Sequence, residues 1–120
     1  MKKTLLVLLF SFVSLFAFEE LTSENFEAKT SKGNRIVDFH ATWWGSCKIL
    51  GKNLHKYSET IKAKDVKIFK LDVGNYSNVA KKYKIAGVPA LIYFKNGKIV
   101  DKKMGVQSVK KLKAFEIKNF

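Results

Sequence analysis

The chain has a single cysteine, Cys47, among its 120 residues. An internal disulfide is therefore excluded, and any thiol chemistry must join this residue to another molecule. Proline is equally scarce, since Pro89 is the only one, and no proline-, glycine- or serine-rich stretch divides the chain. With 47% apolar residues and no repeat, the length fits one domain with one hydrophobic core.

A long hydrophobic run is also missing, because a membrane-spanning helix needs about 20 apolar residues. The N-terminus instead begins with Lys2 and Lys3, continues with the apolar residues 5–10, and stays uncharged to Ala17. This order is typical of a secretory signal. We predict that residues 1–17 are a cleaved signal peptide and that residues 18–120 form a periplasmic or otherwise exported domain; an uncleaved anchor is the alternative.

Acidic residues are few, and arginine is nearly absent. The chain has 10 acidic residues against 23 basic ones and a net charge of +13, yet Arg35 is its only arginine. Proteins that read nucleic acids rely on arginine for bidentate contacts, and these lysines are scattered along the sequence. We therefore expect no nucleic-acid partner and a solvated lysine-rich surface, with weak attraction to anionic membranes as the alternative.

Hydrophobic periodicity predicts alternating strands and helices. Strands are expected at 18–21, 35–41, 66–73 (a central strand), 90–94 and 99–104. Helices are expected from an N-cap at Ser23 to about residue 29, from Gly45 onward, at 75–83, and around residues 109–115. In the second helix Leu50, Leu54, Tyr57 and Ile61 are expected to share one face. Asn96-Gly97 predicts a hairpin turn.

This order predicts an α/β fold. Alternation in the first part of the chain favours parallel strands, and the hairpin adds antiparallel ones. The expected architecture is a central mixed sheet with helices on both faces.

Several separated segments resemble the thioredoxin family in the same order along the chain. They are residues 37–48 (VDFHATWWGSCK), 69–73 (FKLDV), 83–90 (YKIAGVPA), 94–97 (FKNG) and 104–105 (MG). The first is similar to the family's active-site segment, in which a buried strand leads into Trp-Cys-Gly-Pro-Cys-Lys. The resemblance covers about residues 18–120 and implies a thioredoxin fold.

The resemblance implies a thiol–disulfide oxidoreductase with an incomplete active site. The family's first cysteine attacks a disulfide from a helix N-terminus and the second resolves the mixed disulfide. Here Trp44 stands at the first position and Cys47 at the second. The resemblance places Asp38 behind the thiol as proton acceptor, with Lys70 beside it. We expect Cys47 to be a buried, poorly nucleophilic thiol.

The resemblance also implies a substrate-binding surface. Val88 and Pro89 match the family's cis-proline segment, whose backbone holds an extended substrate chain. Trp43 matches the exposed aromatic residue beside the active site, and Gly105 matches a later landmark of the family. A plain structural turn at Pro89 and local packing of Trp43 are the alternatives.

The sequence gives no sign of a metal site or a cofactor, because two histidines and one cysteine at these spacings match no common ligand pattern. A nucleophilic pair of Cys47 with His40 is a minor alternative. The partners implied are exported proteins with thiols or disulfides and an upstream membrane reductant, and we expect a monomer.

Two classes of function follow from these observations. The first is an exported thiol–disulfide oxidoreductase that is inactive or crippled because Trp44 replaces the attacking cysteine. The second is a non-catalytic module that binds extended polypeptide segments, with Trp43 and Trp44 as an apolar landing site. Cysteine and tryptophan codons can differ by one base, so the sequence leaves open whether Trp44 is natural or an altered form of an active protein.

Overall fold

The computed structural model describes residues 18–120, so the predicted signal peptide lies outside the described residues. Five strands form one sheet in the order β1-β3-β2-β4-β5. They are β1 (Glu19–Glu20), β2 (Asn34–His40), β3 (Val66–Asp72), β4 (Ala90–Lys95) and β5 (Lys98–Met104). β1, β3 and β2 are parallel, and β4 and β5 join antiparallel, which confirms the predicted mixed sheet. The strand predicted at 66–73 lies inside the sheet between β1 and β2, as expected, and β2 occupies the middle place.

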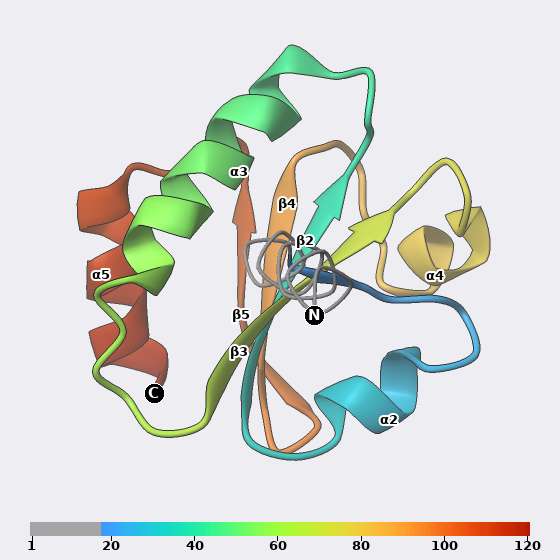
Figure 1. Ribbon diagram of the computed structural model, residues 1–120. Coiled ribbons are helices and arrows are strands. Elements are labelled where there is room, and N and C mark those ends of the chain that lie inside the picture. Colours follow the sequence, from blue (N-terminus) through green and yellow to red (C-terminus); the bar gives the residue numbers. More distant parts are fainter. Residues whose placement is uncertain (1–17) are drawn as a thin grey trace, which may run out of the picture.

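Helices cover both faces of the sheet, as predicted (Figure 1). They are α2 (Phe26–Thr30), α3 (Gly45–Ser58), α4 (Ser77–Lys82) and α5 (Val109–Asn119). α3 and α5 lie together on one face, and α2 and α4 lie on the other. No helix within residues 18–120 is both long and apolar enough to cross a bilayer.

Alternation along β2 builds a separate core on each face. Val37 and Phe39 point to the α2 and α4 side and pack in a cluster with Phe26 and other buried residues. Ile36 points to the opposite side and packs in the cluster formed with α3 and α5. Because successive strand residues face opposite ways, one strand anchors both layers. Each fully buried side chain of this kind stabilises the fold by roughly 1.5–3 kcal/mol.

The predicted apolar face of α3 is confirmed as far as Tyr57, and the extension of the helix to Ile61 was wrong. Leu50, Leu54 and Tyr57 are fully buried against the sheet and α5. The Tyr57 hydroxyl donates a hydrogen bond of 2.8 Å to Glu116 on α5. The helix ends at Ser58, so Ile61 lies beyond it but still packs against the same cluster.

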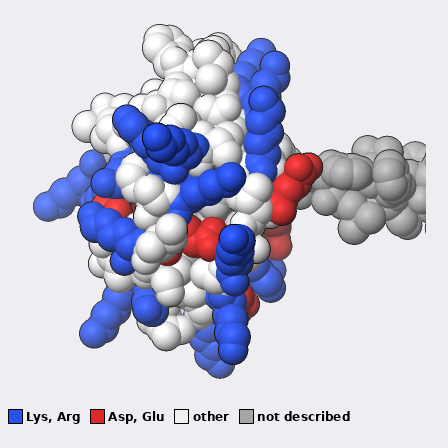
Figure 2. All heavy atoms as spheres, turned by 90° about the vertical axis from the view of Figure 1, so that its left-hand side faces the viewer, with Lys and Arg blue, Asp and Glu red and all other residues white. Residues whose placement is uncertain are grey.

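Lysines that are scattered in the sequence meet on the surface of α3 and α5. Figure 2 looks onto this side of the molecule and shows blue side chains projecting across it, with few red atoms among them. The exposed lysines of these two helices are Lys48, Lys52, Lys56, Lys110, Lys111, Lys113 and Lys118. They come together only because two helices that are distant in sequence pack side by side.

The hairpin predicted at Asn96-Gly97 is present between β4 and β5. Asn96 has φ 50° and Gly97 has φ 85°. Positive φ at both central residues is the geometry of a type I′ turn, which suits the right-handed twist of the flanking strands. Asparagine and glycine tolerate this geometry better than other residues, so the dipeptide fixes the register of β4 and β5.

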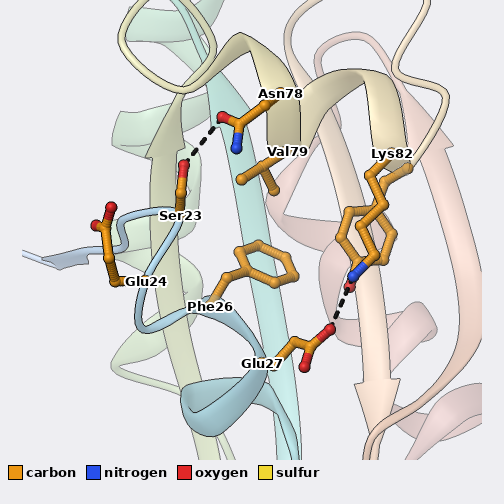
Figure 3. A pocket seen from close by; sticks show the side chains of 8 residues that line it. Ser23, Glu24, Phe26, Glu27, Asn78, Val79 and Lys82 are labelled. Atoms are coloured by element: carbon orange, nitrogen blue, oxygen red, sulfur yellow. Dashed lines mark hydrogen bonds and ion pairs between the residues drawn. The ribbon is translucent and has the colours of Figure 1, made fainter.

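The start of α2 differs from the prediction. The N-cap is Asn25, not Ser23, and the helix begins at Phe26. The Thr22 N–H donates to Asn25 Oδ1 at 2.8 Å, and the Asn25 N–H donates to Thr22 Oγ1 at 3.2 Å. Ser23 instead donates to Asn78 Oδ1 on α4 at 2.9 Å (Figure 3). A long-range contact therefore takes Ser23 out of the capping role.

Candidate functional site

The site begins where β2 ends and α3 starts (Figure 1). β2 ends at His40, and Trp44 is the N-cap of α3 with extended backbone angles of φ −99° and ψ 122°. Cys47 lies in the first turn, where its N–H donates to the Trp44 carbonyl at 3.1 Å. The first turn of a helix offers unpaired N–H groups and partial positive charge, which favour a thiolate that can reach them.

The Cys47 thiol is buried, as predicted. The residue is 6% exposed, and its Sγ accepts a hydrogen bond of 3.4 Å from the Ala41 N–H. Burial raises the pKa of the thiol and nearby Asp38 raises it further, while the Ala41 N–H acts in the opposite direction. A protonated, covered thiol is a poor nucleophile.

Asp38 lies behind Cys47 on β2. It is 4% exposed, and its Oδ1 has no hydrogen-bond partner among residues 18–120. Asp38, Cys47 and Lys70 line one open cavity of about 240 Å³. Burial raises the pKa of Asp38 to about 7; Lys70 lowers it and Glu20 raises it. The structure therefore brings together three of the four predicted catalytic residues around a carboxyl that exchanges its proton near neutral pH.

Glu20 is a member of this site that the sequence did not reveal. Its Oε1 lies 3.1 Å from His40 Nε2 and 3.8 Å from Lys70 Nζ. The parallel registers place Glu20 beside Lys70 and Lys70 beside Asp38. His40 is thus engaged by a carboxylate, a contact that the sequence analysis did not foresee. The sequence alone could not predict these contacts of Glu20, because they depend on the registers between strands from three separate segments.

The predicted substrate-binding residues lie at the same end of the sheet. β4 begins at Ala90, which pairs with Phe39 near the end of β2 and with Met104 at the end of β5. Pro89 therefore lies level with the loop that leads to α3. The Val88–Pro89 peptide bond is cis. Gly105, with φ 82°, donates its N–H to the Pro89 carbonyl at 2.8 Å.

Exposed aromatic surface flanks this end. Trp43 is 69% exposed and Trp44 is 50% exposed. A Cβ atom added to Gly74 would lie 3.1 Å from Cη2 of Trp43, so the indole rests closely against the loop after β3. Met104 is also exposed, and its Cε would lie 3.4 Å from a Cβ on Gly87, just before the Val88–Pro89 bond. Gly74 lies outside the segments of the family resemblance, and Met104 lies in the 104–105 segment but was not among the predicted site residues.

Within residues 18–120, no group of three or more histidine, cysteine, aspartate or glutamate side chains is arranged to hold a metal ion. A second cavity of about 200 Å³ lies between the loop before α2 and α4 (Figure 3). It is bridged by the Ser23–Asn78 hydrogen bond and by a Lys82–Glu27 ion pair of 2.8 Å. It contains none of the predicted site residues, so it belongs to the packing of α2 on α4.

A cysteine in the first turn of a helix, a buried aspartate behind it and a cis-proline loop at the same end of the sheet agree with the thioredoxin fold that the sequence resemblance predicted. The thioredoxin family model matches residues 17–118. This chain belongs to the thioredoxin family.

Known relatives agree with this assignment. The chain is 38% identical over 91 residues to thioredoxin from Staphylococcus aureus, a match that covers 76% of this chain and 86% of that protein. Its structure is similar to that of Malassezia sympodialis thioredoxin, with a TM-score of 0.74, 29% identity, and coverage of 86% and 90% of the two chains. A chain from a study of thiol resolution in yeast mitochondrial 1-Cys peroxiredoxin shares the fold, with a TM-score of 0.76, 23% identity, and coverage of 85% and 95%.

Proposed function

We propose that this chain is an exported thioredoxin-family protein that engages proteins with thiols or disulfides but does not turn disulfides over as its sequence stands. One observation carries the proposal: the only thiol, Cys47, is buried, and Trp44 occupies the helix start where the family resemblance places the attacking cysteine. Disulfide exchange begins with an accessible thiolate. Trp44 supplies no thiol, and Cys47 supplies one that is covered.

An insulin-reduction assay tests this proposal. The unaltered chain should show almost no turnover, while Trp44→Cys should raise the rate by about 100-fold or more, because it restores an attacking thiol beside Cys47 and Asp38. Trp43→Cys is the matched control, since it adds an exposed thiol one residue before the N-cap of α3 and should stay inactive. Turnover by the unaltered chain at the rate of an intact thioredoxin would contradict the proposal.

A second candidate function is a non-catalytic module that holds extended polypeptide segments. The exposure of both Trp43 and Trp44 at the same end of the sheet as the Val88–Pro89 segment favours it, because indoles supply large contact areas at low entropic cost. Titration with cysteine-free extended peptides, followed by tryptophan fluorescence, separates the two candidates. Saturable binding that is lost in Trp43→Ala supports the module, whereas binding only of cysteine-containing peptides supports the redox lineage.

The proposed location is the cell envelope or another exported site. The basic start, short apolar run and uncharged end of residues 1–17 support it. Mass spectrometry of the protein purified from the expressing cell should give an N-terminus at Phe18. An intact Met1 on the purified chain would argue for the uncleaved anchor instead. We further propose that the mature protein is a monomer that meets exported substrates and a membrane reductant.

A further inference from the structure

The outer sides of α3 and α5 form one continuous surface. The two helices pack side by side on the same face of the sheet (Figure 1). The Asn53 side chain on α3 donates to the carbonyl of Gln107, just before α5, at 2.9 Å, and Tyr57 donates to Glu116. These contacts hold the helices in a fixed relation, so groups on their outer sides act together.

Lysines occupy the outer side of both helices at helical spacing. On α3, Lys48, Lys52 and Lys56 recur every four residues, and on α5 Lys110 and Lys113 are three residues apart. Such spacings place side chains on one stripe of a helix. The exposed lysines of the two helices, which we call the lysine face, are Lys48, Lys52, Lys56, Lys110, Lys111, Lys113 and Lys118.

Acidic side chains neutralise little of this charge. α3 contains no aspartate or glutamate, and the only one in α5, Glu116, is 7% exposed. The oxygens of Glu116 accept hydrogen bonds from the Tyr57 hydroxyl and from the Lys62 and Ala63 N–H groups. Lys118 lies 3.7 Å from Asp101, and the other six lysines of the face make no ion pair within residues 18–120. Glu59, the residue that follows the last residue of α3, carries an exposed carboxylate.

An exposed isoleucine lies among these lysines. Ile117 is 84% exposed, more than any other large apolar side chain in residues 18–120. It follows Lys113 by four residues on α5, and both border an open cavity together with Lys62. An exposed apolar side chain with lysines beside it suits shallow insertion among lipid headgroups, where the lysines meet phosphate and the hydrocarbon leaves water.

We propose that the lysine face binds the surface of an anionic phospholipid bilayer, with Ile117 inserted at the depth of the headgroups. Charge complementarity over two helices supports this partner (Figure 2). The face carries no arginine, since Arg35 is a buried residue of β2. Flexible point charges suit a fluid lipid surface better than the fixed bidentate geometry by which arginine recognises nucleic acids.

Binding in this orientation leaves most of the candidate site free, and the two surfaces meet at Lys48, which also lines the cavity beside Asp38 and Cys47. The loop before α3 and the Val88–Pro89 segment lie at one end of the sheet, whereas the lysine face runs along the side of the molecule (Figure 1). The membrane proposal therefore does not depend on the redox proposal. The failure of one leaves the other standing, because vesicle binding and insulin reduction are separate measurements.

Vesicle sedimentation tests the proposal with the full chain, its N-terminus as processed in the cell being identified by mass spectrometry. The probes are vesicles of pure phosphatidylcholine and of phosphatidylcholine with roughly 30% phosphatidylglycerol, a composition chosen for this assay at physiological salt. Binding to neutral vesicles is subtracted as background. The triple variant Lys52→Gln, Lys110→Gln, Lys113→Gln should bind the anionic vesicles about 100-fold more weakly, since each lysine near the surface contributes about fivefold.

A matched triple variant separates this face from net charge alone. Lys32→Gln, Lys81→Gln and Lys95→Gln remove the same charge from exposed positions outside α3 and α5, and should weaken binding far less. Ile117→Ser should weaken binding by roughly fivefold even in high salt, because it removes the inserted apolar group. Equal losses in the two triple variants would overturn the proposal. So would tighter binding of a polyglutamate peptide or a DNA duplex to the same face.

Discussion

Replacing Asp38 by asparagine should stabilise the protein, and the gain should depend on pH. Asp38 is 4% exposed, and burial raises its pKa from 3.8 to about 7. A carboxyl whose pKa is higher in the folded state destabilises that state when it ionises. The penalty is absent below pH 3.8, grows between pH 3.8 and 7, and is complete above pH 7.

The magnitude follows from the pKa of Asp38 in the two states. Each unit by which the folded pKa exceeds the unfolded value costs about 1.4 kcal/mol at high pH, so the roughly three units here amount to about 4 kcal/mol. An asparagine side chain at this position cannot ionise and avoids this cost. The unfolding free energy of the variant minus that of the parent should therefore be about 4 kcal/mol larger at pH 8 than at pH 4.

Urea unfolding at several pH values between about 4 and 8 measures this difference. Asp101→Asn is a control of opposite sign. Burial raises the pKa of Asp101, but hydrogen bonding from Asn119 and the charges of Lys103 and Lys118 outweigh it and lower that pKa. Ionised Asp101 stabilises the fold above its unfolded pKa, so its loss should cost stability near neutral pH and little in strong acid. A stability difference for Asp38→Asn that stays constant over the whole pH range would refute the argument.

Two further predictions concern buried groups. Cys47 should react slowly with a thiol reagent in the native state and quickly in denaturant, because burial limits both access and thiolate fraction; comparable rates in a sample that circular dichroism shows to be folded would revive a reactive single thiol. Glu116→Gln should lower the unfolding free energy at neutral pH by about 2–3 kcal/mol, since it loses charge-assisted bonds to Lys62 and Ala63, while the exposed Glu59→Gln should change it little. Burial raises the pKa of Glu116, but these hydrogen bonds outweigh burial and lower it. The difference in unfolding free energy between Glu116→Gln and the parent should therefore shrink as the pH falls below about 4. Calorimetry that shows an equal loss of stability at acid pH would exclude this cause.

Local patterns were sufficient to predict most elements of this fold. The buried face of α3 follows from the spacing of Leu50, Leu54 and Tyr57, and the hairpin follows from Asn96-Gly97. Both features are decided within a few residues, where side-chain periodicity and turn geometry leave few alternatives.

Features that depend on distant contacts were not predictable in the same way. Ser23 and Asn25 are both good capping residues, and the choice between them is set by the hydrogen bond of Ser23 to Asn78, 55 residues away. Glu20 joins the site only through the register of β1 on β3, which a two-residue strand does not reveal in sequence. The lysine face likewise depends on the packing of α3 against α5.

Asp38 provides a final test of the exchange chemistry that the chain loses with Trp44 at the position of the attacking cysteine. At neutral pH the buried Asp38 costs about 4 kcal/mol, which is a large part of the stability of a small domain unless its proton serves a reaction. If the carboxyl accepts the proton of the Cys47 thiol, Asp38→Asn should slow insulin reduction in a Trp44→Cys background and shift its pH dependence upward, although the double variant is more stable. In the unaltered chain the same change should only stabilise, because no attacking thiol generates the mixed disulfide that Cys47 would resolve. A Trp44→Cys protein whose rate and pH profile are unchanged by Asp38→Asn would show that the carboxyl takes no part in the exchange.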